Sequence, residues 1–244
     1  MRLWAEFSAP GVVRLPVYYN HAVQGLIYRL LPDEYRRTLH DEGYVDGKRS
    51  LKLFTFSRIF GKVLRAESGI IVFQPPVRLC IGSPVERFVS ELANRLIKEP
   101  RVQLAGNELQ LASVEFPKKP PLAGRVEFYT LSPITVYSTL YTADGRKKTY
   151  YYSPQEREFS ELITANLLRK YRACRGEEVK GGVRVTPLRP VKERVVVFKG
   201  TVIRAWSGRF VMEGDTRLIE TAYEAGAGSK NSAGFGMIEV VGGA

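Results

Sequence analysis

Apolar residues recur at helical spacing in the first part of the chain and predict three helices there. The clearest helix spans residues 21–31, with Val23, Leu26 and Ile27 on its apolar face and Asn20 placed to cap it. A second helix is predicted over residues 33–41. The third begins at Ser83, as N-cap, with a proline in the first helical position, and ends before residue 100.

Strands are predicted where aromatic and β-branched residues cluster or alternate with polar ones. In the first part of the chain they cover residues 2–8, 50–61, 68–81 and 108–116. The second part repeats the order of strands and helices. A strand over residues 131–140 and a hairpin arm over 146–152 come first. A helix over residues 153–171 follows, with Ser153 as its cap. The remaining elements are strands 194–199 and 201–212, helix 215–226 and strand 234–241.

Each half therefore has the order βαββαβ, which predicts an α+β fold of two tandem ferredoxin-like (RRM-like) domains. We expect the domains to cover residues 1–125 and 126–244. In that topology an antiparallel sheet carries two helices on one face, and RNA-recognition modules share it. Because a fold does not determine a function, the chemistry must be inferred from particular residues.

The charge balance indicates an anionic partner. Lys and Arg number 37 against 25 acidic residues, a net charge of +12 over 244 residues. Nucleic acid is favoured over a membrane, because neither a basic amphipathic helix nor an apolar run of about 18 residues is present. Cys80 and Cys174 match no metal-ligand spacing, so we expect two buried thiols in a cytoplasmic protein, with a disulfide as the alternative. No metal or cofactor is expected.

Three residues within 25 positions could together cleave RNA: Tyr28, His40 and Lys52. Cleavage by the RNA's own 2′-hydroxyl needs a base, an acid for the departing 5′-oxygen and a cation for the phosphorane, and these side chains can supply all three. His40 is one of only two histidines, with His21. Each residue also has a purely structural interpretation, as core aromatic, helix cap or solvated lysine.

A glycine-rich segment, GAGSKNSAGFG, spans residues 226–236. Glycine permits positive φ and lets backbone N–H groups approach an anion closely. We therefore expect RNA contacts from Gly226, Gly228, Lys230, Asn231, Gly234 and Gly236. Replacing Gly234 by valine is expected to weaken RNA binding in a protein that still folds. A dinucleotide loop would follow a strand and open a helix, whereas this segment does the reverse. A flexible linker is the alternative.

A second candidate RNA contact lies in the stretch 184–209, which is rich in Lys and Arg and holds Glu193 as its only acid. Cations beside aromatic residues suit phosphate contact and base stacking. We expect Lys192, Arg194 and Lys199 to bind RNA. A solvated hairpin tip is the alternative interpretation.

These residues resemble a known family. YNHAVQGLIYRLL (19–31), LKLFTFS (51–57), LSPITV (131–136) and GAGSKNSAGFGMIEV (226–240) are similar to the CRISPR-associated endoribonucleases of the Cas six family, within the repeat-associated mysterious protein superfamily. The resemblance implies tandem ferredoxin-like domains and metal-independent cleavage of CRISPR repeat RNA to 5′-hydroxyl and 2′,3′-cyclic phosphate ends. It implies Tyr28 as general base, His40 as general acid and Lys52 as the cation that stabilises the transition state.

Several alternatives stay open at this point. A tyrosine base needs its pKa of about 10 lowered, with Lys52 as the candidate cause, so Tyr28 could instead only position the RNA. His21 matches a histidine that is often found in the family's motif, and the resemblance leaves its role open. The chain could also be a non-cleaving RNA-binding subunit of a CRISPR effector complex, or an RNA-binding protein outside CRISPR systems. Expected partners are repeat RNA and an effector complex, and no membrane. We expect a monomer or a homodimer.

Overall fold

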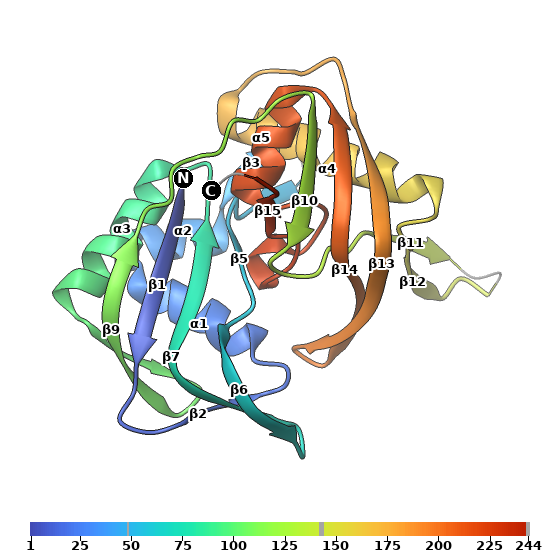
Figure 1. The fold of residues 1–244 in the computed structure, drawn as a ribbon. Coiled ribbons are helices and arrows are strands. Elements are labelled where there is room, and N and C mark those ends of the chain that lie inside the picture. The colour runs from blue at the N-terminus through green and yellow to red at the C-terminus, as the bar shows by residue number, and fades with distance from the viewer. Residues whose placement is uncertain (48, 142–143, 243–244) are drawn as a thin grey trace.

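The computed structural model describes residues 1–47, 49–141 and 144–242. In this part of the chain two large antiparallel sheets stand side by side, each with its helices packed on one face (Figure 1). The α+β class and the two tandem ferredoxin-like units predicted from the sequence are confirmed. The division at residues 125 and 126 stays a prediction, and Arg125 already pairs with Glu213 in the second sheet.

The first sheet is seven-stranded, with the order β2-β7-β1-β9-β8 and with β5 and β6 also paired to β7. It carries helices α1 (Asn20–Leu30) and α3 (Glu86–Lys98), and α2 (Asp33–Asp41) follows α1 along the chain. Its strands are β1 (Arg2–Ser8), β2 (Val13–Pro16), β5 (Thr55–Phe56), β6 (Phe60–Glu67), β7 (Ile70–Gly82), β8 (Arg101–Leu104) and β9 (Asn107–Glu115).

The second sheet is four-stranded, with the order β13-β14-β10-β15. Its outer strands are thus the second and the fourth along the chain, which is the ferredoxin-like arrangement. Helices α4 (Arg157–Arg175) and α5 (Thr216–Ala225) cover it. Its strands are β10 (Arg125–Thr130), β13 (Val183–Phe198), β14 (Thr201–Gly214) and β15 (Ile238–Val240), and the 3₁₀ turn η1 (Asn231–Ala233) precedes β15.

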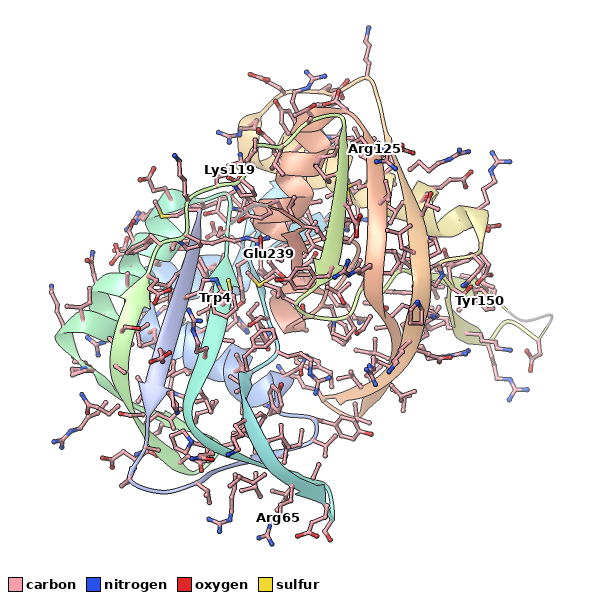
Figure 2. All side chains as sticks on the ribbon, in the orientation of Figure 1. Trp4, Arg65, Lys119, Arg125, Tyr150 and Glu239 are labelled. Carbon is pink, nitrogen blue, oxygen red and sulfur yellow. The ribbon has the colours of Figure 1, made fainter. Side chains whose placement is uncertain are left out.

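Two hairpins lie outside the large sheets. The first joins β3 (Tyr44–Asp46) to β4 (Arg49–Leu51), and the second joins β11 (Tyr137–Tyr141) to β12 (Lys147–Tyr151). The second hairpin carries Tyr150 at the edge of the molecule (Figure 2). Its arm at 146–152 was predicted from the sequence and is confirmed.

Each half has its own apolar core between sheet and helices. In the first half, the buried rings of Phe54 and Phe88 stack with centroids 4.9 Å apart. In the second, Phe128 and Phe210 stack at 5.5 Å. Stacked aromatic pairs contribute about 0.5–1.5 kcal/mol beyond the apolar area they bury.

The strand predicted over residues 131–140 is wrong in its first part. The strand of the sheet is β10, which ends at Thr130. Ile134 then forms an isolated bridge to Trp206, and a continuous ladder begins again at Tyr137 in β11. The backbone N–H groups of Leu131 and Ser132 both donate to the carbonyl of Met237, and Pro133 has no N–H to continue a ladder. Similarly, predicted strand 50–61 is interrupted around Leu53, whose φ is +47°.

One predicted helix cap is wrong, and two helices begin later than predicted. Asn20 belongs to α1, and its side chain bonds the second half of the chain. Helix α3 begins at Glu86, but the Ser83 hydroxyl accepts the N–H of Val85 at 3.1 Å, as a cap does, and donates to the carbonyl of Leu53. Helix α4 begins at Arg157, but the Ser153 hydroxyl accepts the N–H of Gln155 at 3.3 Å, and the Glu156 carboxylate accepts the N–H of Ser153. For Asn20, local sequence cannot distinguish a cap from a polar side chain that bonds a distant segment.

A buried arginine ties the two halves together. The guanidinium of Arg2, in β1, lies 3.3 Å from the ring centre of Tyr223 and donates to the carbonyl of Ile238 at 2.6 Å. It also forms an ion pair at 3.1 Å with Glu239, which lies between the halves in Figure 2. A buried guanidinium is stable only when its donors are bonded, so these contacts hold β1 against α5 and β15.

Candidate active site

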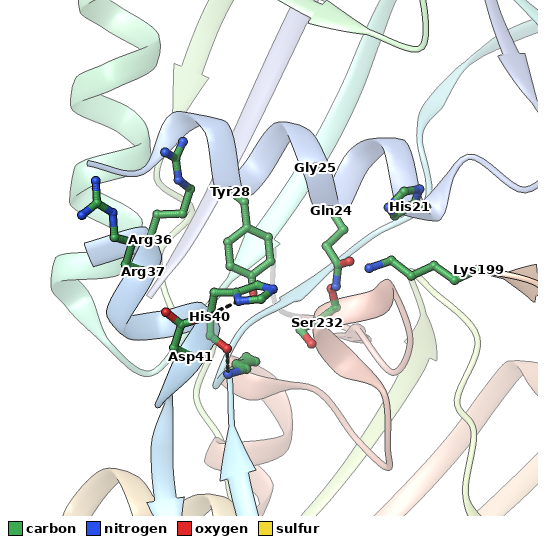
Figure 3. A pocket seen from close by; sticks show the side chains of 11 residues that line it. His21, Gln24, Gly25, Tyr28, Arg36, Arg37, His40, Asp41, Lys199 and Ser232 are labelled. Atoms are coloured by element: carbon green, nitrogen blue, oxygen red, sulfur yellow. Dashed lines mark hydrogen bonds and ion pairs between the residues drawn. The ribbon is translucent and has the colours of Figure 1, made fainter. Parts of the chain in front are cut away.

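One cavity of about 480 Å³ collects the three predicted catalytic residues (Figure 3). It lies mainly on the first half, against α1, α2 and the segment after β4, and the second half closes one side. Eleven residues line it: His21, Gln24, Gly25, Tyr28, Arg36, Arg37, His40, Asp41, Lys52, Lys199 and Ser232. The structure therefore brings Tyr28, His40 and Lys52 together, although they come from three different elements.

Tyr28 projects from α1 toward His40, with ring centroids 6.0 Å apart. The ring of Phe54 packs edge-on behind it at 5.8 Å. This burial raises the pKa of Tyr28 to about 12. The direction is opposite to the lowering that a tyrosine base needs, and Lys52 does not cause a downward shift. In this geometry the phenol is protonated near neutral pH.

His40 lies in the last turn of α2 and is mostly solvent-exposed. Its Nδ1 lies 2.8 Å from a carboxylate oxygen of the neighbouring Asp41. A carboxylate at Nδ1 orients the ring, which leaves Nε2 as the atom that faces a substrate. His40 has the chemistry of a general acid at the mouth of the cavity.

Lys52 lies between β4 and β5 rather than at the start of a strand. Its ammonium donates to the backbone carbonyl of His40 at 2.7 Å and to the hydroxyl of Ser50 at 3.2 Å. Partial burial lowers the pKa of Lys52, and the charge of Asp41 opposes that shift. The hydrogen bond to His40 holds this cation beside the end of α2.

Further cations surround the cavity. Arg36 and Arg37 come from α2, and Arg36 pairs with Asp33 at 2.8 Å. Lys199 reaches in from the turn between β13 and β14 (Figure 3), and the adjacent Phe198 ring meets His21 edge-on at 6.0 Å. An excess of positive charge over the single carboxylate Asp41 suits a phosphodiester.

The predicted basic strip divides between two places. Lys199 lines the cavity of the candidate active site, whereas Lys192 and Arg194 line a separate open groove together with Tyr129 and Arg209. That groove has a volume of about 520 Å³ and lies against β10, β13 and β14. RNA contact by these three basic residues stays a prediction.

The glycine-rich loop, residues 226–236, is packed between the halves. Gly226, Gly228, Gly234 and Gly236 are buried, with φ of +86°, +74°, +84° and +76°. The N–H groups of Gly226, Gly234 and Gly236 bond carbonyls within the protein. Packing thus accounts for these glycines, and phosphate contact by the loop stays a prediction. Within the loop, Ser229, Lys230 and Ser232 are partly exposed.

Side chains of the first half bind the loop's carbonyl groups. Asn20 donates to Ala233 at 2.9 Å and Gln24 donates to Ser232 at 2.7 Å. Thr55 donates to Phe235 at 3.1 Å. Within the loop, the amide of Asn231 donates to the carbonyls of residues 227 and 235. These bonds make the loop a fixed part of the cavity wall, so the flexible-linker interpretation is wrong.

Sequence reasoning missed Gln24, Arg36, Arg37, Asp41 and Ser232 as lining residues. The helical spacing contained part of the information that would have identified them. Gln24 precedes Tyr28 by four positions on α1, and Arg36 precedes His40 by four on α2, so each pair shares a helix face. Ser232 has no such signal, because it arrives from the other half.

No cluster of three or more His, Cys, Asp or Glu with a geometry for metal binding occurs in the described ranges. Both cysteines are free; Cys80 is buried as expected, whereas Cys174 is only partly buried. Within the same ranges, every helix is too short or too polar to cross a bilayer.

Comparison with known proteins relates the chain to CRISPR-associated endoribonucleases. Cas6 of Pyrococcus furiosus is 27% identical over 231 residues, which cover 94% of this chain and 84% of the relative. Cas6 1 of Methanocaldococcus jannaschii is 27% identical over 243 residues, covering 98% and 92%. A solved structure described as CRISPR associated protein Cas6 is 25% identical, covers 99% of both chains and has a TM-score of 0.81.

The fold and the site define a protein of two tandem ferredoxin-like domains with a basic, histidine-containing cavity at their junction. The family model described as CRISPR associated protein Cas6, C-terminal, matches residues 116–240, just over half of the chain. The chain belongs to the Cas6 family, and the resemblance drawn from the sequence motifs is confirmed.

Gly234 gives a test of the loop's packing. A Cβ atom there would lie 2.4 Å from the ring of Phe56 and 2.6 Å from the amide of Asn20, at a φ of +84°. We now expect Gly234→Ala to lower the free energy of unfolding by about 2–5 kcal/mol, through backbone strain plus overpacking. Urea denaturation measures it. Gly69→Ala is the matched control, since residue 69 has φ +77° and an added Cβ atom there would meet open space. This variant should lose only about 1–2 kcal/mol of unfolding free energy. Equal losses would contradict the packing role.

Proposed function

We propose that this protein is an endoribonuclease that cuts CRISPR repeat transcripts without a metal ion, leaving 5′-hydroxyl and 2′,3′-cyclic phosphate ends. The observation that carries the proposal is the convergence of Tyr28, His40 and Lys52 on one basic cavity. The endoribonuclease names of the relatives from Pyrococcus and Methanocaldococcus support RNA cleavage, and the net charge of +12 supports RNA as the substrate.

The proposed reaction is an intramolecular displacement at phosphorus. The 2′-oxygen of the nucleotide before the cut loses its proton and bonds to phosphorus, while the bond from phosphorus to the 5′-oxygen breaks. His40 donates a proton to that departing oxygen, and Asp41 orients the imidazole. Lys52 offsets the negative charge that develops on the phosphorane, with Arg37 and Lys199 close to the same cavity.

Tyr28 has two candidate roles in this reaction. Family resemblance assigns it the general base, but its pKa of about 12 leaves almost no phenolate near neutral pH. The geometry favours a positioning role, in which the phenol donates a hydrogen bond to the attacking 2′-oxygen and the proton leaves to solvent. Tyr28 acts as base only if bound RNA lowers its pKa substantially.

The proposed partners follow from the same observations. Repeat RNA is the substrate, and a CRISPR effector complex is the candidate recipient of the cut product. We propose a cytoplasmic protein that works as a monomer or a homodimer, with domains over residues 1–125 and 126–244.

Metal independence has a direct test. Because three protein groups supply the positioning, the proton and the positive charge, cleavage of repeat RNA should proceed at an unchanged single-turnover rate in excess EDTA. Gel analysis of labelled RNA measures the rate. Loss of cleavage with EDTA and its recovery with magnesium would refute the proposed mechanism.

His40→Ala removes the proposed acid. The 5′-oxygen is a poor leaving group without a proton, so the single-turnover cleavage rate should fall by about 10²–10⁴-fold. RNA affinity should change little, because one side chain among many phosphate contacts is lost. His21→Ala is the control, since it removes the other histidine of the cavity and should have a smaller effect.

Two results would overturn this assignment. Native-rate cutting by His40→Ala would place the acid elsewhere, and a parallel loss of RNA binding would make the residue structural. An RNA with 2′-deoxyribose at the cut site should bind and stay uncut. If the unmodified protein binds repeat RNA and leaves every bond intact, it is instead the non-cleaving RNA-binding subunit.

Tyr28→Phe distinguishes a base from a positioning group. If the phenol only donates a hydrogen bond worth about 1.4 kcal/mol, the rate should fall about tenfold, and by the same factor between about pH 6 and 9. The raised pKa predicts this constant ratio, because the phenol keeps its proton throughout that range. A base would lose its proton progressively as pH rises, so a wild-type to variant ratio that climbs with pH would restore the base assignment.

A further inference from the structure

A second cavity, of about 390 Å³, adjoins the first. It lies between the β4–β5 segment of the first half and α4, β11 and the glycine-rich loop of the second. Lys52 and Ser232 line both cavities, so a strand that passes through the first can continue into the second. Its volume falls within the range of about 300–1,000 Å³ that is usual for small-molecule sites.

The charged side chains that line the second cavity are all basic. Arg49, Lys52, Lys170 and Lys230 line it, and no Asp or Glu is among its lining residues. The neighbouring carboxylate of Asp46, opposite Arg49 in the hairpin, is held by two hydrogen bonds from Arg172. An uncompensated group of cations in a recess attracts an anion such as phosphate.

Lys170, on α4, is a buried residue that lines this cavity. Its ammonium donates to the carbonyls of Gly226 at 2.6 Å and Gly228 at 3.1 Å. Burial lowers the pKa of Lys170 to about 7, and no carboxylate of the described residues pairs with it. A buried ammonium without a counter-ion is unfavourable, and an anion nearby would compensate its charge.

Asn166 lies one helical turn before Lys170 on α4 and lines the same cavity. Its side-chain oxygen is buried and has no hydrogen-bond partner among the described residues. Such an orphaned acceptor needs an explanation, since nearly all buried polar atoms are bonded. A half-turn of the amide exchanges its oxygen and its NH₂ group, and both groups match the edge of a nucleobase.

An aromatic ring also lines the second cavity, in addition to its cations and its amide. Tyr137, at the start of β11, lines the cavity, and the ammonium of Lys230 lies 4.9 Å from its ring centre. The ammonium lies over one face of the ring. Nucleobases stack on aromatic rings, so a base that displaces this ammonium can stack on Tyr137 while Lys230 contacts the attached phosphate. The cation, the ring and the unbonded amide oxygen therefore match the phosphate, the face of the base and the edge of the base in one nucleotide.

We propose that the second cavity binds one nucleotide of the RNA next to the cleaved bond, with Asn166 bonding the base edge, Tyr137 against the base, and Arg49 and Lys230 contacting its phosphate. The inference rests on the proposed function, because the RNA strand reaches this cavity through the active site. It makes Asn166 a residue that determines specificity at a single position of the repeat.

A double-mutant cycle between protein and RNA tests the proposal. The RNA carries 2′-deoxyribose at the cut site, so it cannot be cleaved, and an abasic nucleotide is placed in turn at each position flanking the cut. Fluorescence anisotropy measures the Kd. With the wild-type protein, one abasic position should weaken binding about tenfold, as expected for loss of a stacked and bonded base. With Asn166→Leu, the same abasic position should weaken binding less than about threefold.

Asn94→Leu is the matched control, since Asn94 is an exposed asparagine on α3 outside the second cavity. This variant should keep the full tenfold penalty at the same position. If Asn166→Leu fails to fold in a thermal melt, Tyr137→Leu takes its place in the cycle. Abasic penalties that are equal in wild type and variant, or absent at every position, would overturn the proposal.

The cycle also separates this proposal from the proposed function. Because the RNA cannot be cut, coupling between Asn166 and one nucleotide is measured without any cleavage. A protein that shows the coupling yet leaves unmodified repeat RNA intact would refute the nuclease and keep the subsite. A protein that cuts unmodified RNA but shows additive effects would refute the subsite and keep the nuclease.

Discussion

The close approach of the glycine-rich loop to α1 and β5 is the constraint on which the rest of the structure depends. Asn20, Gln24 and Thr55 bind carbonyl groups of this loop, and a Cβ atom at Gly234 would collide with Phe56. The two halves can therefore approach this closely only because residue 234 has no side chain. This contact brings Ser232 to the wall of the active-site cavity, so the site is completed by the junction of the halves.

Burial on either side of this junction causes the unusual electrostatics of the protein. Lys170 is buried behind the loop with a pKa lowered to about 7, and Tyr28 is buried beside Phe54 with a pKa raised to about 12. In both cases loss of hydration disfavours the charged form. The consequence for chemistry is specific: Tyr28 is suited to donate a hydrogen bond.

Prediction from sequence succeeded where the signal was local. Helices α1, α2 and α5 match their expected ranges to within one residue at each end. Apolar spacing, and an N-cap such as Asp215 of α5, can be identified from a few neighbouring residues. It failed over residues 131–136, whose apolar side chains are buried without a continuous strand ladder. It also misassigned Asn20, because a polar residue at the start of a helix is normally its cap.

The sequence by itself determined the two-fold repeat of βαββαβ units, the strongly basic charge, the motifs of the Cas6 family and the candidate set of Tyr28, His40 and Lys52. Only the tertiary structure decided which side chains complete the cavity, the direction in which the pKa of Tyr28 shifts, and the position of Asn166 beside Lys170 in a second cavity. The physical reason is the distance along the chain over which each property is set. Periodicity and charge are properties of a segment, whereas burial and hydrogen-bond partners depend on contacts such as that between Asn20 and Ala233, which lie more than 200 positions apart.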